Sequence, residues 1–293
     1  MTAVSVLMTT FNAGGYLQVA VESLLAQTHS DWELILVDNG STDCSIESMG
    51  LTDPRIRLLT LRENIGRTPA LKLALENAQH PYVAVLDADD VCRRDRLEIQ
   101  SRFLDDHSKF VLVGSGVDVI DTQGQVTGVL CLQTGTVSQN ALAERNVFVN
   151  SSLMYRRQAA LAIGGYDPRF EFAQDYHLIL RIASQGECYV LPESLTLFRV
   201  SPSSYTKSAR MRLVRSMDEV ELFRLAPEIL KLSAEGIQLN RRRQAISNAA
   251  LAFAAIREHQ YRLATTAICS ALRADPRMTW IRYLVQGRQI PNI

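Results

Sequence analysis

Three carboxylates crowd the end of a short apolar run in "VLDADD", residues 85–90. Like charges at this spacing repel one another, so each needs solvent or a partner of opposite charge. One explanation of Asp87, Asp89 and Asp90 is a divalent cation, because Mg²⁺ and Mn²⁺ prefer carboxylate oxygens. The other explanation is an ordinary polar exit from a strand.

Three further apolar runs end in polar segments: "TTFN" (9–12), "DNGSTD" (38–43) and "RENIGR" (62–67). In open α/β sheets, ligands bind beyond the carboxyl ends of the strands. Each segment by itself also fits ordinary turn chemistry. Four polar exits at one edge of a sheet together indicate a binding site.

Two alternating kinds of element must position these segments. Helical periodicity spans 14–27 and 68–79, with Thr68 as the predicted N-cap and Pro69 as the first helical residue. Runs rich in Val, Ile and Leu predict buried strands at 4–8, 33–37, 56–61, 82–86 and 110–120. This alternation predicts an α/β fold with a doubly wound, mostly parallel sheet.

The pattern changes near residue 207, where strand-like segments stop and amphipathic helices follow one another. We therefore predict two domains, an α/β domain at 1–207 and a C-terminal α-helical appendage at 208–293. Residues 261–276 look like the second helix of a tetratricopeptide repeat, but a stable array needs about three repeats. A helical cap is the favoured interpretation. The basic cluster 241–243 fits a contact with anionic lipid or an acidic partner, but a solvated helix face is the favoured interpretation.

Any phosphate would have to be bound without a glycine-rich loop. The sequence has no GxGxxG after its first predicted strand and no GxxxxGK[ST], so it predicts neither a dinucleotide fingerprint nor a P-loop. A carboxylate-bound Mg²⁺ or Mn²⁺ would hold phosphates instead. The Phe11 ring offers a stacking face for a base, and the Asp38 carboxylate can accept an N–H from its edge.

Composition narrows the class of protein. The 293 residues carry a formal net charge of zero, which gives no indication of bulk nucleic-acid binding. The five cysteines form no CxxC, which argues against a disulfide framework or a zinc site and fits a reducing cytoplasm. The sequence starts without a signal peptide and has no run of the ~18 apolar residues that span a bilayer. We expect a cytoplasmic protein, with peripheral contact at the inner face of the membrane left open.

Four segments together resemble glycosyltransferase family 2, and the resemblance covers about residues 3–205. They are the N-terminal "VSVLMTTFNAGGYLQVAVESLLAQTHSDWELILVDNGSTD", then "ENIGRTPALKLAL", "YVAVLDADD" and "GGYDPRFEFAQDYHLILRIA". The resemblance implies an inverting, metal-dependent nucleotide-sugar transferase of the GT-A fold, with 1–207 as its catalytic domain.

The resemblance also implies a donor site. Thr9 and Phe11 match the loop around the nucleotide base, where the family usually has Tyr in place of Phe11. Asp38 matches the acid that contacts the base. Arg67 falls in the segment that approaches the base and the ribose.

The remaining matches concern the sugar diphosphate and the acceptor. Asp87 and Asp89 match the DxD motif, which implies that Asp87 faces the ribose and Asp89 binds the metal. Asp175 matches the expected general base. Arg199 falls where a segment folds over the pyrophosphate.

The chain departs from the family pattern at four further positions, which leave the acceptor and the loop closure open. Gln174 replaces the Glu that usually precedes the base, and His177 stands where an acid is frequent. Asn150 and Ser201 stand where histidine is common.

The predicted reaction is a single displacement at the anomeric carbon, with Asp175 taking the proton of the acceptor hydroxyl. UDP is the nucleotide that the resemblance favours, and the acceptor is a saccharide, a lipid-linked oligosaccharide or a protein. A nucleotidyltransferase is disfavoured, because "TTFNAGGY" offers no Lys or Arg for a triphosphate. A non-catalytic module that binds sugar nucleotides or recruits a partner remains the other alternative.

Overall fold

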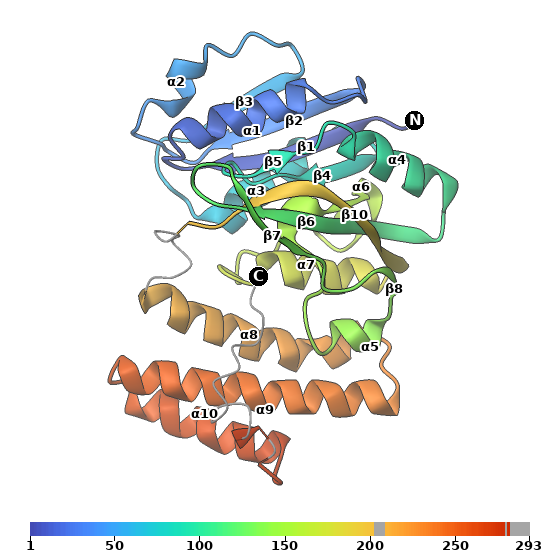
Figure 1. The fold of residues 1–293 in the computed structure, drawn as a ribbon. Helices are drawn as coiled ribbons and strands as arrows, with labels where there is room; N and C mark the ends of the chain where they lie inside the picture. Colours follow the sequence, from blue (N-terminus) through green and yellow to red (C-terminus); the bar gives the residue numbers. More distant parts are fainter. Residues whose placement is uncertain (202–208, 279, 282–293) are drawn as a thin grey trace. The chain divides into compact units, whose positions relative to one another are not determined.

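The N-terminal part of the chain builds a sheet from alternating strands and helices (Figure 1). The computed structural model describes residues 1–201, 209–278 and 280–281. All five predicted strands are confirmed, as β1 (Val4–Thr10), β2 (Trp32–Asp38), β3 (Ile56–Thr60), β4 (Tyr82–Val85) and β6 (Phe110–Ile120). The intervening helices are α1 (Gly15–Leu25), α2 (Ser45–Met49), α3 (Arg67–Asn77) and α4 (Arg96–Asp106).

The strands of the described residues form one ten-stranded sheet in the order β3-β2-β1-β4-β9-β6-β10-β5, with β7 joined to β6 and β8 to β10. Strands β3, β2, β1 and β4 run parallel, as do β6 and β10, whereas β9 lies antiparallel between the two groups. The predicted doubly wound, mostly parallel α/β fold is therefore confirmed. The other elements of this part are β5 (Val91–Cys92), β7 (Val126–Leu130), β8 (Gly135–Val137), η1 (Asn150–Ser152), β9 (Met154–Arg156), α6 (Arg157–Ala162) and β10 (Glu187–Arg199).

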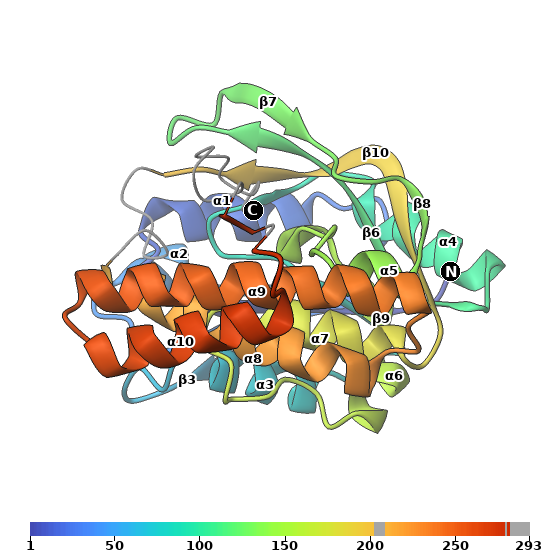
Figure 2. The ribbon, with the colours of Figure 1, turned by 90° about the horizontal axis from the view of Figure 1, so that it is seen from below.

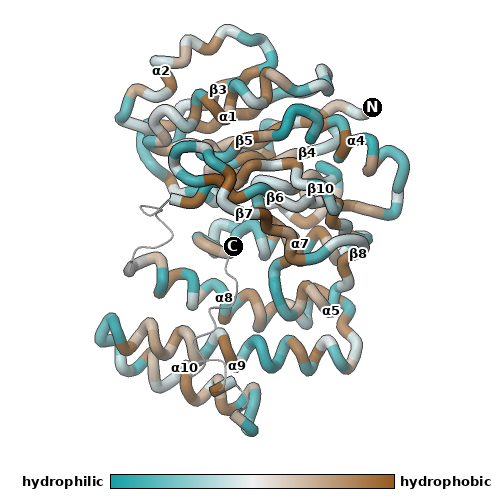
Figure 3. Tube along the Cα trace, in the orientation of Figure 1, coloured by the Kyte–Doolittle hydropathy of each residue, from teal (hydrophilic) through white to brown (hydrophobic). Residues whose placement is uncertain are grey.

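Apolar side chains bury both faces of the sheet, as expected for strands that read as continuous apolar runs. Val4, Val6 and Met8 of β1 point into a core shared with α1 and α4. Helix α3 packs against β1 and β2 (Figure 1). The hydropathy colouring follows the same pattern, with hydrophobic residues along the strands and hydrophilic residues in the loops (Figure 3).

The predicted start of α3 is wrong by two residues. The N-cap is Gly66, with φ of 92°, and the helix begins at Arg67, so Thr68 lies inside the first turn and is not the cap. A backbone conformation with positive φ suits glycine and is strained in a residue with a Cβ. Pro69 remains in the first turn, where its missing N–H costs no helical hydrogen bond.

The chain separates into two compact units that divide it differently from the predicted domains. The first holds the described parts of 1–137, 147–169 and 181–202, and the second those of 138–146, 170–180 and 203–293. The division therefore passes through α7 (Gln174–Ala183). The predicted boundary near 207 lies outside the described residues, and the division into 1–207 and 208–293 stays a prediction.

Helices make up the second unit. Helix α9 (Ala234–Arg257) packs against both α8 (Ala209–Ile229) and α10 (Tyr261–Ala274), and α5 (Gln139–Leu142) also contacts it. The three long helices lie side by side (Figure 2), and their shared core contains Leu251, Ala252 and Ala267. Within the described residues, no helix combines the length and the hydropathy that crossing a membrane would require.

A buried arginine fixes the end of β4, the strand that leads into "DADD". The Arg96 side chain is fully buried, and its Nη2 donates to the carbonyl oxygens of Val85 at 3.0 Å and of Leu153 at 2.9 Å. Its Nε donates to Gln100 Oε1 at 3.0 Å. A buried cation is tolerated only when such acceptors surround it. Arg96 therefore joins the end of β4 to the segment that follows η1.

We predict that Arg96→Leu lowers the free energy of unfolding by about 3 kcal/mol, because two buried carbonyl oxygens would lose their donor. Urea denaturation of the purified protein measures this loss. Arg102→Leu in the same helix is the matched control, since Arg102 only makes an exposed ion pair with Glu98. Equal losses in the two variants would contradict the prediction.

Candidate donor and catalytic site

The loops that follow β1 and β2 are tied together at the predicted edge. Thr10, the last residue of β1, lies opposite Asp38, the last residue of β2. The Asn39 N–H donates to the Thr10 carbonyl at 2.9 Å, and the Asp38 carboxylate accepts the Ser41 N–H at 2.9 Å. Asp38 is buried, whereas Phe11 is 48% exposed, so its ring is available for stacking.

The loop after β2 also lies directly against the loop after β3. Gly40 has φ of 80°, and a Cβ at this position would lie 2.7 Å from the carbonyl carbon of Glu63. The Asn39 side chain donates to Asn64 Oδ1 at 3.0 Å and accepts the Ile65 N–H at 3.0 Å. These contacts position the start of α3, which carries Arg67.

Arg67 and Asp87 meet across twenty positions of sequence. Arg67 Nη2 lies 2.5 Å from Asp87 Oδ1, and Asn150 Nδ2 donates to the same oxygen at 2.9 Å. The Asp87 N–H donates to the Ser151 hydroxyl at 3.1 Å. Arg67 and Asn150 therefore hold the first carboxylate of "DADD", and Ser151 holds the backbone of the same residue. Sequence reasoning noted Asn150 only as a departure from the family pattern and did not predict this contact.

Asp89 and Asp90 have different environments. Asp89 is exposed, yet partial desolvation by the surrounding protein, followed by repulsion from the Asp87 carboxylate, raises its pKa. Asp90 is buried, and burial followed by the charges of Asp87 and Asp89 raises its pKa well above the usual value. Asp90 Oδ1 accepts the Arg199 N–H at 2.7 Å, which gives this carboxyl group a structural role.

The Arg199 side chain joins three segments around the site. Its Nε donates to the Asp89 carbonyl at 2.8 Å, and its Nη1 donates to the Asp121 carbonyl at 2.7 Å. The guanidinium carbon lies 4.5 Å from the centre of the Tyr16 ring, a cation–π distance. These bonds fix the backbone of "DADD", whereas the predicted role at the pyrophosphate stays a prediction. No sequence signal pointed to Tyr16.

The donor set fits a divalent cation only in part. Among the described residues, no group of three or more His, Cys, Asp or Glu side chains is placed to hold a metal ion. Asp89 and Asp87 nevertheless offer hard oxygen ligands, and mutual repulsion is one cause of the raised pKa of Asp89. Mg²⁺ commonly binds through one or two carboxylates and completes its shell with water and substrate phosphates. Such a site needs no third protein ligand.

Asp175 belongs to the second compact unit and lies in the first turn of α7. An acidic residue there also interacts favourably with the helix dipole. The other seven predicted site residues lie in the first unit. Of these, the structure brings Arg67 into contact with Asp87, and Arg199 into contact with the backbone of Asp89.

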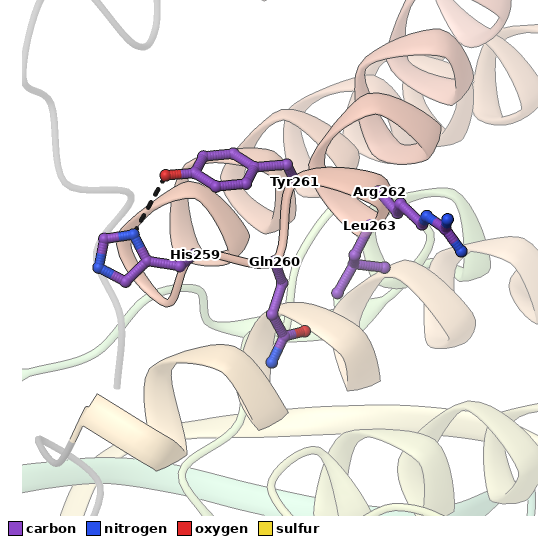
Figure 4. A pocket seen from close by; sticks show the side chains of 5 residues that line it. All are labelled: His259, Gln260, Tyr261, Arg262 and Leu263. Carbon is purple, nitrogen blue, oxygen red and sulfur yellow. Dashed lines mark hydrogen bonds between the residues drawn. The ribbon is translucent and has the colours of Figure 1, made fainter.

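A separate pocket of about 440 Å³ lies at the turn between α9 and α10 (Figure 4). Its walls are the five consecutive residues 259–263, and His259 Nδ1 lies 3.1 Å from the Tyr261 hydroxyl. None of the predicted site residues lines it.

Comparison with known proteins relates this chain to glycosyltransferases. Residues 5–163 match the family described as Glycosyl transferase family 2. The amylovoran biosynthesis glycosyltransferase AmsE of Erwinia amylovora is 29% identical over 217 residues, which cover 71% of this chain and 79% of that protein. The O-antigen biosynthesis glycosyltransferase WbnJ of Escherichia coli is 30% identical over 217 residues, which cover 70% of this chain and 83% of that protein.

Solved structures share the fold. The mannosyltransferase PcManGT from Pyrobaculum calidifontis, in complex with GDP-Man and Mn²⁺, matches with a TM-score of 0.63 at 19% identity, over 98% of this chain and 79% of that one. S. aureus TarS 1-349 in complex with UDP-GlcNAc matches with a TM-score of 0.62 at 15% identity, over 92% of each chain. At these identities the likeness concerns the fold alone, and it confirms the predicted GT-A architecture.

We predict that Gly40→Ala lowers the free energy of unfolding by about 2 kcal/mol or more, because the added Cβ combines a strained φ with a backbone clash. Gly124→Ala is the matched control, since Gly124 has the same φ of 80° and no neighbour within 4 Å. Urea denaturation of both variants separates the clash from the strain. If both variants lost the same free energy of unfolding, the backbone clash at position 40 would have no measurable cost, and the prediction would be contradicted.

Proposed function

Because the chain belongs to glycosyltransferase family 2, we propose that it transfers a sugar from a nucleotide-diphosphate sugar to an acceptor hydroxyl with inversion at the anomeric carbon. The observation that carries this proposal is the strand-end cluster in which Arg67 pairs with Asp87 beside the exposed Asp89. An anionic diphosphate fits an edge that offers both a guanidinium and a metal-binding carboxylate.

The nucleotide part of the donor would lie against the loops after β1 and β2. Phe11 is exposed and offers a ring face, and Asp38 offers a carboxylate oxygen to a base N–H. Thr9 lies in the last two residues of β1, two positions before Phe11, and Arg67 is the first residue of α3. We propose a UDP-sugar as the donor. TarS in complex with UDP-GlcNAc supports the choice of a nucleotide sugar, and PcManGT in complex with GDP-Man supports it equally.

A divalent cation, Mn²⁺ or Mg²⁺, would be held by Asp89 with Asp87 beside it. It would supply positive charge that offsets the charge of the departing diphosphate. PcManGT was solved with Mn²⁺, which supports this proposal. The protein's own contribution is to keep Asp89 exposed while Arg67, Asn150 and the Arg199 backbone fix its neighbours.

Asp175 would accept the proton of the acceptor hydroxyl as the oxygen attacks the anomeric carbon. Asp175 is half-buried in the first turn of α7. An ionised carboxylate is the state that a general base requires.

The acceptor is proposed to be a saccharide or a lipid-linked saccharide of a cell-envelope polysaccharide. Two relatives carry names of this kind, amylovoran biosynthesis for AmsE and O-antigen biosynthesis for WbnJ. A protein acceptor remains the alternative. The helices after residue 208 would serve the acceptor, a partner or a membrane surface.

We further propose a peripheral contact of α10 with the inner face of the cytoplasmic membrane. Tyr261, Ile268 and Leu272 are exposed and share one face of α10, and the exposed Arg262 and Arg273 lie along one side of that face. Exposed apolar residues beside arginines suit the surface of an anionic bilayer.

The membrane proposal predicts binding to vesicles that contain phosphatidylglycerol and much weaker binding to phosphatidylcholine vesicles. Changing Arg262 and Arg273 together to Glu should weaken binding by at least ~10-fold, because each arginine near an anionic surface contributes about 1 kcal/mol. Co-sedimentation measures this, with Arg102→Glu as the matched exposed control. Equal binding of all three proteins would contradict the contact.

We predict that Asp89→Ala removes the Mn²⁺-dependent part of UDP or GDP binding and leaves the fold intact, because an exposed strand-end acid contributes little to packing. Calorimetric titration with and without Mn²⁺ measures the affinity. Asp106→Ala, an exposed acid at the end of α4, is the control. If wild type and Asp89→Ala bound the nucleotide equally well in the presence of Mn²⁺, the metal role would be contradicted and "DADD" would be only a polar exit from a strand.

We predict that Asp175→Asn reduces sugar transfer by ~10²–10⁴-fold, about 3–5 kcal/mol in the barrier, and leaves nucleotide affinity unchanged. Asn keeps the size of Asp and still accepts a hydrogen bond, so a structural role would survive, but it cannot accept the proton. Transfer rate, nucleotide affinity and melting temperature are measured together, with Glu228→Gln as the control. Activity within ~5-fold of wild type would remove Asp175 from the mechanism.

A further inference from the structure

The N-terminus of α7, which carries Asp175, has no capping side chain of its own at the cap position. The Ala173 carbonyl accepts the His177 N–H at 2.9 Å, which makes Ala173 the residue at the cap. Most helices place Ser, Thr, Asp or Asn there, because a side-chain oxygen can bind the free N–H groups of the first turn. Alanine has no such oxygen.

A carboxylate from the C-terminal helix α8 instead binds the backbone just before α7. Asp218 Oδ2 accepts the N–H of Phe172 at 2.7 Å and the N–H of Ala173 at 3.0 Å. All of these residues belong to the second compact unit. The two N–H groups are those that lead directly into α7, two and three positions before Asp175.

Asp218 is only 8% exposed, so its charge needs these bonds. Burial raises the pKa of Asp218, and the backbone N–H donors of Ala173 and Phe172 act in the opposite direction. A carboxylate beside a helix N-terminus also gains from the helix dipole. A buried acid that satisfies the backbone of another helix fixes the position of that backbone.

Two further contacts from α8 bind the residues on either side of Asp175. The Arg215 guanidinium carbon lies 5.0 Å from the centre of the Phe172 ring. The Phe223 ring lies 5.8 Å from the Tyr176 ring in an edge-on arrangement, and the Tyr176 hydroxyl donates to the Leu142 carbonyl at 2.5 Å. Helix α8 thus contacts the chain both before and after the carboxylate.

We propose that Asp218 is a positioning residue that holds the carboxylate of Asp175 in place through the first turn of α7. The inference rests on the proposed role of Asp175 as the general base. It gives the C-terminal helices a task in the reaction itself, because displacement of a reacting group by about 1 Å can cost ~10²-fold in rate.

The first test needs no substrate. In Asp218→Ala, hydrogen exchange of the amides at 172–177 should be ~5-fold faster than in wild type, because the substitution removes the acceptor of the Phe172 and Ala173 N–H groups and loosens the start of α7. Glu228→Ala, an exposed position of the same helix, is the matched control and should leave exchange unchanged. Unchanged exchange at 172–177 in Asp218→Ala would overturn the inference. Asp218→Asn retains one acceptor oxygen and should give a smaller effect, and it replaces Asp218→Ala in every measurement if that variant does not fold.

The second test is a double-mutant cycle with Asp175→Asn. The reaction measured is donor hydrolysis, in which water takes the place of the acceptor hydroxyl. Its rate is followed as UDP released from UDP-GlcNAc, or GDP released from GDP-mannose, with Mn²⁺ present and at a temperature where every variant is folded. Asp218→Ala should slow release by ~10–10²-fold in the wild-type background. In the Asp175→Asn background it should cause no further loss, because the group that it positions is already inactive. UDP and GDP affinity should stay within ~2-fold of wild type throughout.

Two different failures can be told apart. If Asp175→Asn alone leaves the rate unchanged, the general-base role fails, and the inference that rests on it fails with it. If Asp175→Asn is slow but Asp218→Ala reduces the rate by the same factor in both backgrounds, Asp218 acts independently of Asp175. That result would overturn the positioning role and leave the general base in place.

Discussion

A buried guanidinium at the end of β4 is the contact on which the candidate donor site depends. Arg96 donates to the Val85 carbonyl, two residues before Asp87, and to the Leu153 carbonyl in the segment after η1. Asn150, the first residue of η1, binds the Asp87 carboxylate. A cation in this position is stable only with a full set of acceptors, so it fixes the relative positions of every strand end that it touches.

Three neighbouring carboxylates can coexist because each lies in a different environment. Asp87 has Arg67 as its counter-ion, whereas Asp90 is buried and binds the backbone N–H of Arg199. Asp89 alone is exposed, and its pKa is raised. A single fold element could not provide these three environments, because the stabilising groups come from α3, from β10 and from the loop before β9. The site therefore depends on contacts between elements that are far apart in the sequence.

The second compact unit changes the interpretation of the C-terminal helices. Helix α8 binds the backbone that leads into α7 through Asp218 and packs on Tyr176 through Phe223. These contacts lie within the unit that includes the start of the candidate catalytic helix. A helical cap that only covered apolar surface would make no such hydrogen bonds to the backbone before α7. The predicted helical character of the C-terminal region is confirmed for its described part, residues 209–278, whereas its boundary as a separate domain stays a prediction.

The sequence by itself determined the strands, because a strand buried on both faces requires an unbroken apolar run, as in β1, β2 and β4. It also allowed the prediction that Asp38 and Asp89 lie at one edge of the sheet, because the carboxyl ends of parallel strands meet at the same side. It could not determine that α3 begins after Gly66, because Thr68 and Pro69 fit an N-terminus equally well. Only the tertiary structure decided the pairs that span the chain. Arg67 meets Asp87, and Asp218 binds the backbone that leads to Asp175, because packing brings distant segments within hydrogen-bonding distance, and no local spacing encodes that distance.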